Sequence, residues 1–148
     1  MTNTNGGSPV IEEMTAREAY ALLIGDDRAQ LVDVRTRAEW SFVGAPLQVG
    51  AHAPIFCEWQ AWPDMQISPR FADDLAAELE ARGVGRDAPL VFLCRSGARS
   101  RAAAQVMIAA GWRRCVNVSD GFQGPPDGEG HRSRLTGWQA SGLPWRQN

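Results

Sequence analysis

The residues with the clearest chemical potential in this chain form the run Cys94-Arg95-Ser96-Gly97-Ala98-Arg99-Ser100. An apolar stretch, Leu90 to Leu93, precedes this run, and an alanine-rich stretch, Arg101 to Ala110, follows it. That order places the cysteine at a strand-to-helix turn. The loop amides and the positive end of the following helix favour a thiolate over a thiol and can hold an anion beside it. We therefore expect Cys94 to be a nucleophile rather than a small buried hydrophobic residue.

The remaining residues of this loop are candidates for binding the substrate. Gly97 lets the backbone turn tightly, so that the amides between Cys94 and Arg99 can converge on one point and cradle a sulfur anion. Arg95 and Arg99 can each offer paired N–H donors to the oxygen atoms of an anionic substrate. The alternative for either arginine is a solvated charge or a salt bridge to an acid such as Glu58. The expected substrate-binding residues are Arg95, Ser96, Gly97, Ala98 and Arg99.

Other polar and thiol-bearing residues are expected to have structural roles. A salt bridge or hydrogen bonds of Asp33 and Arg35 would tie the end of a strand to neighbouring loops. Ser100 would cap the helix that follows the loop. Cys57 and Cys115 fall in predicted strands and are expected to be buried, although Cys57 could also serve as a second, relay thiol.

Length, charge and cysteine usage restrict the class of protein. The 148 residues suit one domain over residues 10–148, preceded by a disordered polar tail at residues 1–9. The net charge of −2 gives no reason to expect nucleic acid or a membrane surface as partner. Three dispersed cysteines form neither a disulfide framework nor a metal pair, which suits the reducing cytoplasm. No secretory signal, membrane span, metal-ligand motif or nucleotide motif is visible, and His52 and His131 have no Asp or Cys neighbour in sequence that marks a base or metal site.

Helical and strand signals alternate along the chain. The patterns Thr15 to Glu18 and Thr36 to Glu39 are capping boxes, which mark helix starts. The expected elements are a helix to Ile24, a strand over 30–34, a short helix to Phe42, an irregular edge strand within 51–57, a helix entered at Ser68-Pro69 and closed by Gly83, a strand over 90–93, a helix over 100–110 and a strand over 115–118. This order predicts an α/β fold of three layers, with a mainly parallel central sheet and helices on both faces. Ligands bind beyond the carboxyl ends of such strands, where Cys94 lies.

Three segments resemble the single-domain rhodaneses, a family of thiosulfate sulfurtransferase-like proteins. They are Leu31 to Arg35 followed by Glu39-Trp40, the loop Cys94 to Ser100, and Trp138 with the segment Ala140 to Trp145. The resemblance implies the rhodanese-like three-layer fold and a sulfurtransferase that needs no cofactor. Such an enzyme moves sulfane sulfur from thiosulfate or a persulfide donor to a thiophilic acceptor through a persulfide on Cys94. Its partners would be a small anionic donor and a protein or small thiol acceptor.

The sequence departs from the family pattern in two stretches, and two alternative functions remain open. The stretches 43–57 and 120–136 are longer than in the minimal family pattern and could reshape the mouth of the pocket, which leaves the acceptor undetermined. A protein tyrosine phosphatase-like enzyme on the same fold also uses a cysteine loop ending in arginine, but that loop holds one residue more than the four between Cys94 and Arg99. A non-enzymatic sulfur-carrier or regulatory module is the other alternative.

Overall fold

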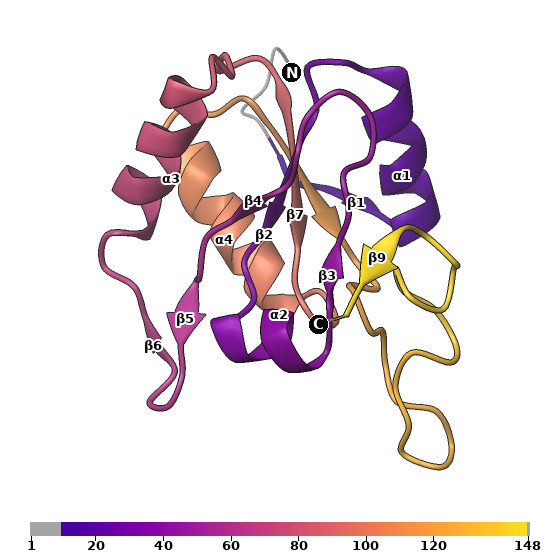
Figure 1. Ribbon diagram of the computed structural model, residues 1–148. Coiled ribbons are helices and arrows are strands. Elements are labelled where there is room, and N and C mark those ends of the chain that lie inside the picture. Colours follow the sequence, from indigo (N-terminus) through magenta and orange to yellow (C-terminus); the bar gives the residue numbers. More distant parts are fainter. Residues whose placement is uncertain (1–9, 148) are drawn as a thin grey trace.

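Five parallel strands form the centre of the computed structural model, which describes residues 10–147 (Figure 1). The strand order across the sheet is β1 (Glu12–Met14), β8 (Arg114–Val118), β7 (Pro89–Leu93), β2 (Gln30–Asp33) and β4 (Ile55–Phe56). Each neighbouring pair is parallel. The tail predicted for residues 1–9 lies outside the described residues.

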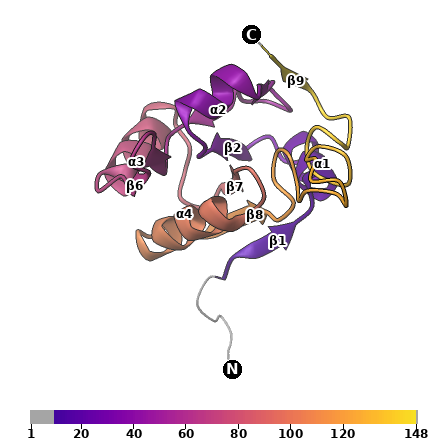
Figure 2. The ribbon, with the colours of Figure 1, turned by 90° about the horizontal axis from the view of Figure 1, so that it is seen from below.

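Side chains on the two faces of this sheet form two hydrophobic cores, because successive residues of a strand point to opposite sides. In β7, Leu90 and Phe92 pack with α3 (Phe71–Ala81) and α4 (Ala98–Ala109). Val91 and Leu93 pack with α1 (Ala16–Gly25) and with the chain that follows β8. Seen from below, α3 and α4 lie on one side of the strands and α1 on the other (Figure 2). The predicted α/β fold with a parallel sheet between helical layers is confirmed.

Shorter elements surround the carboxyl end of the sheet. Helix α2 (Arg37–Phe42) follows β2, and β3 (Ala45–Pro46) pairs antiparallel with β9 (Trp145–Arg146) near the end of the chain. Strands β5 (Gln60–Ala61) and β6 (Gln66–Ile67) form a separate antiparallel pair. None of these short strands was expected from the sequence. They are two residues long, so they leave no periodic pattern.

Local signals located most helices but misplaced two starts. Thr15 and Thr36 both form complete capping boxes, as predicted. Helix α3 begins at Phe71 rather than at Pro69, because the Phe71 amide bonds to the Ser68 carbonyl in a turn that precedes the helix. The predicted cap at Ser100 is wrong, since α4 already begins at Ala98 and its N-cap is Gly97.

The edge strand expected within 51–57 is present as β4, but only Ile55 and Phe56 pair with β2. Strand β1 was not predicted from the sequence; it extends the sheet at the opposite edge. Among residues 10–147 no helix combines the length and apolar character needed to cross a lipid bilayer.

An ion pair without solvent exposure lies at the carboxyl end of β2. Arg35 Nη2 lies 2.7 Å from Asp33 Oδ2, and both side chains are 0% exposed. The same nitrogen donates a hydrogen bond to the Gly44 carbonyl at 2.9 Å. The guanidinium carbon lies 4.1 Å from the centre of the Phe122 ring. The salt bridge thus connects β2 with the segments after α2 and after β8.

Replacing Asp33 by Asn should lower the free energy of unfolding by about 3 to 5 kcal/mol, because the variant leaves the Arg35 charge buried and uncompensated. Urea denaturation measures this loss. The matched control is Asp87→Asn, which breaks the exposed ion pair with Arg113 and should cost less than about 1 kcal/mol. Equal, small losses in both variants would contradict a supporting role for the buried pair.

Candidate active site

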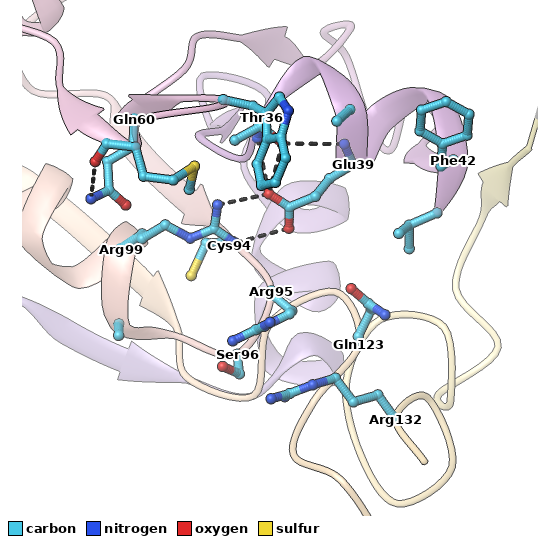
Figure 3. Close-up of a pocket in the computed structure, with 15 residues that line it drawn as sticks. Thr36, Glu39, Phe42, Gln60, Cys94, Arg95, Ser96, Arg99, Gln123 and Arg132 are labelled. Carbon is cyan, nitrogen blue, oxygen red and sulfur yellow. Dashed lines mark hydrogen bonds and ion pairs between the residues drawn. The ribbon is translucent and has the colours of Figure 1, made fainter. Parts of the chain in front are cut away.

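Cys94 lies at the floor of a cavity of about 680 Å³ at the carboxyl edge of the sheet (Figure 3). The residue follows β7 directly and is only 1% exposed. Its sulfur accepts a hydrogen bond from the Gly97 amide at 3.1 Å. Helix α4 begins at the next residue, Ala98, so the positive end of a 12-residue helix lies beside the sulfur. This arrangement favours negative charge on the sulfur and on a ligand next to it.

The conformation of this loop requires glycine at its fourth position. Gly97 has a φ of 110°, and a Cβ atom there would lie 2.5 Å from the Ser119 carbonyl oxygen. The positive φ turns the Gly97 amide toward the sulfur while the chain enters α4. Any side chain at this position would push the loop away from the strand end.

The segment after β8 clamps the loop from the other side. The Phe122 amide donates to the Cys94 carbonyl at 2.8 Å, and the amides of Gln123 and Gly124 donate to the Arg95 carbonyl at 3.0 and 3.1 Å. A Cβ atom on Gly121 would lie 2.3 Å from the same Arg95 oxygen, so the approach is closer than any other residue permits. The carbonyls of Cys94 and Arg95 are thereby satisfied by the segment after β8.

A buried polar network connects the sulfur with the surface. The Ser100 hydroxyl lies 3.1 Å from Cys94 Sγ and 2.5 Å from Asn117 Oδ1. The Asn117 amide nitrogen donates to Glu13 Oε1 at 2.8 Å and to the Gly97 carbonyl at 3.1 Å. These two acceptors set the orientation of the amide and leave its oxygen facing Ser100. The single Ser100 proton thus has three acceptors within reach, Asn117 Oδ1, Cys94 Sγ and the Gly97 carbonyl at 3.3 Å, and its shortest contact is the one to Asn117.

Arg99 makes a two-pronged ion pair that spans the cavity wall. Its Nη1 and Nη2 donate to the two carboxylate oxygens of Glu39 at 2.7 and 2.9 Å (Figure 3). Burial alone would raise the pKa of Glu39, but the hydrogen bonds and charge of Arg99, with help from Thr36, lower it to about 2. The acid that holds Arg99 is thus Glu39 and not Glu58, which instead accepts a hydrogen bond from the Arg37 amide.

Two further arginines reach the cavity, and only one was expected. Arg95 follows the cysteine and is exposed at the cavity rim. Arg132 enters from the long stretch after β8 and donates a hydrogen bond to the Gly124 carbonyl at 2.6 Å. Their side chains extend in the same direction on one side of Cys94 (Figure 3). Ser96 and Ala98 also line this cavity, so the structure brings the predicted loop residues together.

Aromatic and aliphatic side chains make up the rest of the cavity wall. Phe42 at the end of α2 and Trp62 after β5 both line it, together with Val43 and Met65. Phe42 is 80% exposed and Trp62 is 71% exposed, which is unusual for rings of this size. The cavity therefore has a cationic side and an apolar side, with the sulfur between them.

The other two cysteines do not line this cavity. Cys57 is half-buried, less than expected; burial and the charges of Asp74 and Glu58 raise the pKa of its thiol to about 11. Cys115 is fully buried in β8, and burial raises the pKa of its thiol to about 12. Both side chains therefore remain neutral thiols near neutral pH.

His131 does have acidic neighbours in space. Possible ligand atoms of Asp127, Glu129 and His131 lie within 4.8 Å of one another on the surface. However, Asp127 Oδ1 accepts the backbone amides of Glu129 and His131, and Arg134 lies 3.1 to 3.4 Å from both acids. These charges are already partnered, so we assign no metal site to this cluster.

Asn117, Glu39 and Arg132 are among the residues of the site that were not predicted from the sequence as site residues. Asn117 carried a signal, because it is a polar residue inside an otherwise apolar strand segment. Glu39 also carried one, but its position in a capping box already explained it. Arg132 carried none, since an arginine in a long polar loop is ordinary.

Comparison with known proteins identifies related sequences. The sequence model of the rhodanese-like domain family matches residues 15–124. An uncharacterized protein of Rickettsia conorii is 36% identical over 136 residues, which cover 92% of this chain and 98% of that protein.

Solved structures with the same fold are also known. The crystal structure of Rv0390 from M. tuberculosis is similar with a TM-score of 0.80 and 44% identity, covering 93% of this chain and 98% of that one. The solution structure of a polysulfide-sulfur transferase homodimer from Wolinella succinogenes has a TM-score of 0.58 and 20% identity, covering 93% and 80%. Because the identity to the Wolinella succinogenes protein is only 20%, this similarity shows a shared fold and no more.

Replacing Asn117 by Val should speed the alkylation of Cys94 at neutral pH. Without the Asn117 oxygen, the Ser100 hydroxyl is free to donate to the sulfur, and one added hydrogen bond to the thiolate should raise the rate by about twofold to tenfold. The measurement is the rate of iodoacetamide labelling of Cys94 at pH 7, read by mass spectrometry. The double variant Asn117→Val, Ser100→Ala should lose this gain, because Ser100 transmits it. An unchanged or slower rate in Asn117→Val would contradict the network.

The Glu39 to Arg99 ion pair should make a pH-dependent contribution to stability. Because the pKa of Glu39 falls from an ordinary 4.5 to about 2, the contribution is present above pH 4.5 and is lost as the pH falls toward 2. Glu39→Gln should therefore unfold more easily than the wild type by about 1 to 3 kcal/mol at neutral pH, and the gap should close in acid. Urea denaturation at several pH values measures it. Glu80→Gln, at an exposed contact of 3.9 Å with Arg86, is the control that should show no such gap.

Proposed function

Since this chain belongs to the rhodanese-like domain family, we propose that it moves sulfane sulfur from thiosulfate or a persulfide donor to a thiophilic acceptor through a persulfide on Cys94. The observation that carries the proposal is the position of the Cys94 sulfur. It lies at the floor of the cavity, bonded to the Gly97 amide and beside the N-terminus of α4. Such surroundings favour a thiolate and the persulfide anion that replaces it.

The first half-reaction loads sulfur onto the enzyme. The Cys94 thiolate attacks the outer sulfur of thiosulfate and forms a new S–S bond. The original S–S bond breaks, and sulfite leaves with its electron pair. The negative charge now resides on the outer sulfur of the Cys94 persulfide, where the helix N-terminus and nearby loop amides stabilise it.

The second half-reaction unloads the sulfur. A nucleophilic acceptor, either cyanide or the thiolate of a small molecule or protein, attacks the outer sulfur of the persulfide. The Cys94 thiolate leaves, so no electrons or protons are consumed and no cofactor is needed. The recessed sulfur, with Cys94 only 1% exposed, limits competing attack by water and unrelated thiols.

The arginines of the loop have different roles in this proposal. Arg95 is the loop cation that can bind the charged end of the donor, together with the amides around Ser96 and Ala98. Arg99 is compensated by Glu39, so it shapes the cavity wall more than it attracts the donor. In this proposal Asp33, Arg35 and Ser100 support the loop rather than contact the substrate.

A phosphatase reaction is the second candidate, and two observations count against it. The loop holds only four residues between Cys94 and Arg99, so it surrounds a smaller volume than a phosphoryl group needs. In addition, both outer nitrogens of Arg99 are bonded to Glu39 and are not directed at a ligand above Cys94. A non-enzymatic sulfur carrier would hold the same Cys94 persulfide. It differs from our proposal only in that it would not catalyse repeated cycles of sulfur transfer.

The biological setting forms part of the same proposal. The Wolinella succinogenes protein of this fold is a polysulfide-sulfur transferase, which agrees with sulfur transfer at fold level only. A reducing cytoplasm would keep Cys94 and the acceptor thiol in the state that the reaction requires. A small anionic donor and a protein or small thiol acceptor are the partners we propose.

Incubation with thiosulfate should add one sulfur atom to Cys94, and cyanide should remove it as thiocyanate. Mass spectrometry of the intact protein measures the first step, and thiocyanate release measures the second. Cys94→Ser should lose essentially all turnover. The matched controls Cys57→Ser and Cys115→Ser should keep it, since burial raises the pKa values of these thiols to about 11 and 12.

Two results would overturn the proposal. One is thiocyanate formation by Cys94→Ser at the wild-type rate, because the nucleophile would then be elsewhere. The other is rapid Cys94-dependent hydrolysis of an aryl phosphate without any sulfur transfer, which would favour the phosphatase.

A further inference from the structure

Glu13 does not line the cavity, yet two buried side chains connect it with the Cys94 sulfur. It belongs to the edge strand β1, where it pairs in register with Asn117 of β8. Glu13 Oε1 accepts a hydrogen bond from the Asn117 amide nitrogen at 2.8 Å, and the Ser100 hydroxyl lies between Asn117 and the sulfur. Glu13 also precedes residue 15, where the match to the family model begins. A residue at the edge of the sheet is therefore in a position to act on the sulfur without touching it.

This series of contacts runs from the surface into the interior. The Glu13 side chain is 41% exposed, whereas Asn117 is 2% exposed and Ser100 is 0% exposed. The second carboxylate oxygen of Glu13 accepts from Arg101 Nε at 2.9 Å, so both carboxylate oxygens have a partner. Asn117 and Ser100 are shut off from water and exchange hydrogen bonds only with the groups around them. A change at Glu13 therefore alters how these two side chains share their hydrogen bonds.

The amide of Asn117 could face Ser100 with either its oxygen or its nitrogen. Glu13 and the Gly97 carbonyl both accept from the nitrogen, at 2.8 and 3.1 Å. A turned amide would place its oxygen against these two acceptors, so the oxygen faces Ser100 instead. The carboxylate is the stronger of the two acceptors, because hydrogen bonds to an ionised group are roughly twice as strong as neutral ones. It also polarises the amide, which makes the Asn117 oxygen a better acceptor.

The Ser100 proton is the point at which this orientation matters for the sulfur. The Ser100 oxygen lies 2.5 Å from Asn117 Oδ1, 3.1 Å from Cys94 Sγ and 3.3 Å from the Gly97 carbonyl oxygen. A hydroxyl group has one proton to donate, so these acceptors compete for it. Whatever strengthens the bond from Ser100 to Asn117 weakens donation to the sulfur.

We propose that Glu13 is a positioning residue that keeps the Ser100 proton on Asn117 and away from the Cys94 sulfur. A hydrogen bond to the sulfur would stabilise the thiolate, and a more stable thiolate is a better leaving group. Glu13 therefore slows the departure of Cys94 from its persulfide and helps to retain the sulfur until an acceptor attacks. This consequence rests on the sulfur transfer proposed above, whereas the effect on the thiolate itself does not.

Reversing the charge at Glu13 tests the proposal. In Glu13→Lys the new ammonium group attracts the Asn117 oxygen and repels the amide hydrogens, which favours the turned amide and frees the Ser100 proton for the sulfur. The rate of iodoacetamide labelling of Cys94 at pH 7, read by mass spectrometry, should rise by about twofold to tenfold. Glu13→Gln keeps an oxygen that can accept from Asn117, so its rate should stay within about twofold of the wild type. Glu13→Met removes the acceptor without adding a charge and should give an intermediate rate.

Two comparisons separate this path from a general effect of charge. Glu12→Lys makes the same change at the neighbouring position of β1, where the side chain is 38% exposed and both carboxylate oxygens bond to Arg114. Its labelling rate should stay within about twofold of the wild type. The second comparison is between Ser100→Ala and the double variant Glu13→Lys, Ser100→Ala. These two should be labelled at equal rates, because no hydroxyl proton remains to be redirected.

The same variants test the consequence for sulfur transfer. Protein loaded with thiosulfate and freed of excess donor is mixed with cyanide, and thiocyanate release is followed over a single turnover. Release from Glu13→Lys should be faster than from Glu12→Lys by about twofold to tenfold, because the thiolate that leaves gains a hydrogen bond.

The outcomes separate this inference from the proposed function. Equal labelling rates in Glu13→Lys and Glu12→Lys would overturn the inference. An effect of Glu13→Lys that persists in the Ser100→Ala background would also overturn it, because charge alone would then explain the change. Faster labelling with unchanged thiocyanate release would overturn the effect on the persulfide. Failure of thiosulfate to load wild-type Cys94 would instead contradict the proposed function, and the labelling rates, which need no sulfur donor, would still decide the role of Glu13.

Discussion

The positive charge of Arg35 is enclosed by protein, and the loops around the cavity depend on how that charge is satisfied. A buried guanidinium is costly unless it is paired and hydrogen-bonded. Asp33 supplies the opposite charge, the Gly44 carbonyl accepts a hydrogen bond, and the Phe122 ring covers one face of the group. These partners come from the end of β2, the chain after α2 and the chain after β8. Arg35 therefore holds together three segments that no regular sheet pairing connects.

Phe122 connects the buried Arg35 ion pair with the reactive loop. Its amide bonds to the Cys94 carbonyl, while its own carbonyl accepts the Gln139 amide. The Cys94 and Arg95 carbonyls thus bond to amides of the segment after β8. The Gly97 amide and the first turn of α4 remain directed at the sulfur. A loop held only by its own residues would have to satisfy donors and acceptors locally, and the anion site would be lost. The segment after β8 is accordingly part of the site, although it contributes no nucleophile.

Three arginines line the cavity, but only two of them keep an uncompensated positive charge. Glu39 neutralises Arg99 and also caps α2 through Thr36, so one carboxylate orders both the helix and the wall. Arg95 and Arg132 keep their charge on the opposite side of Cys94. A cavity with three uncompensated arginines would bind any anion tightly. Neutralising one of them confines attraction to one side and leaves room for apolar contact on the other.

The sequence alone determined the features that arise from local hydrogen bonds and periodicity. The capping boxes at Thr15 and Thr36, the apolar strand before Cys94 and the loop itself could all be recognised, because each depends on residues a few positions apart. The tertiary structure decided which partners those residues meet. Arg99 pairs with Glu39 across 60 positions, and Asn117 reaches Glu13 across 104. Arg132 reaches the cavity only because its loop folds back over Gly124. Such contacts follow from the packing of whole elements, and packing leaves no pattern in the short stretch around either partner.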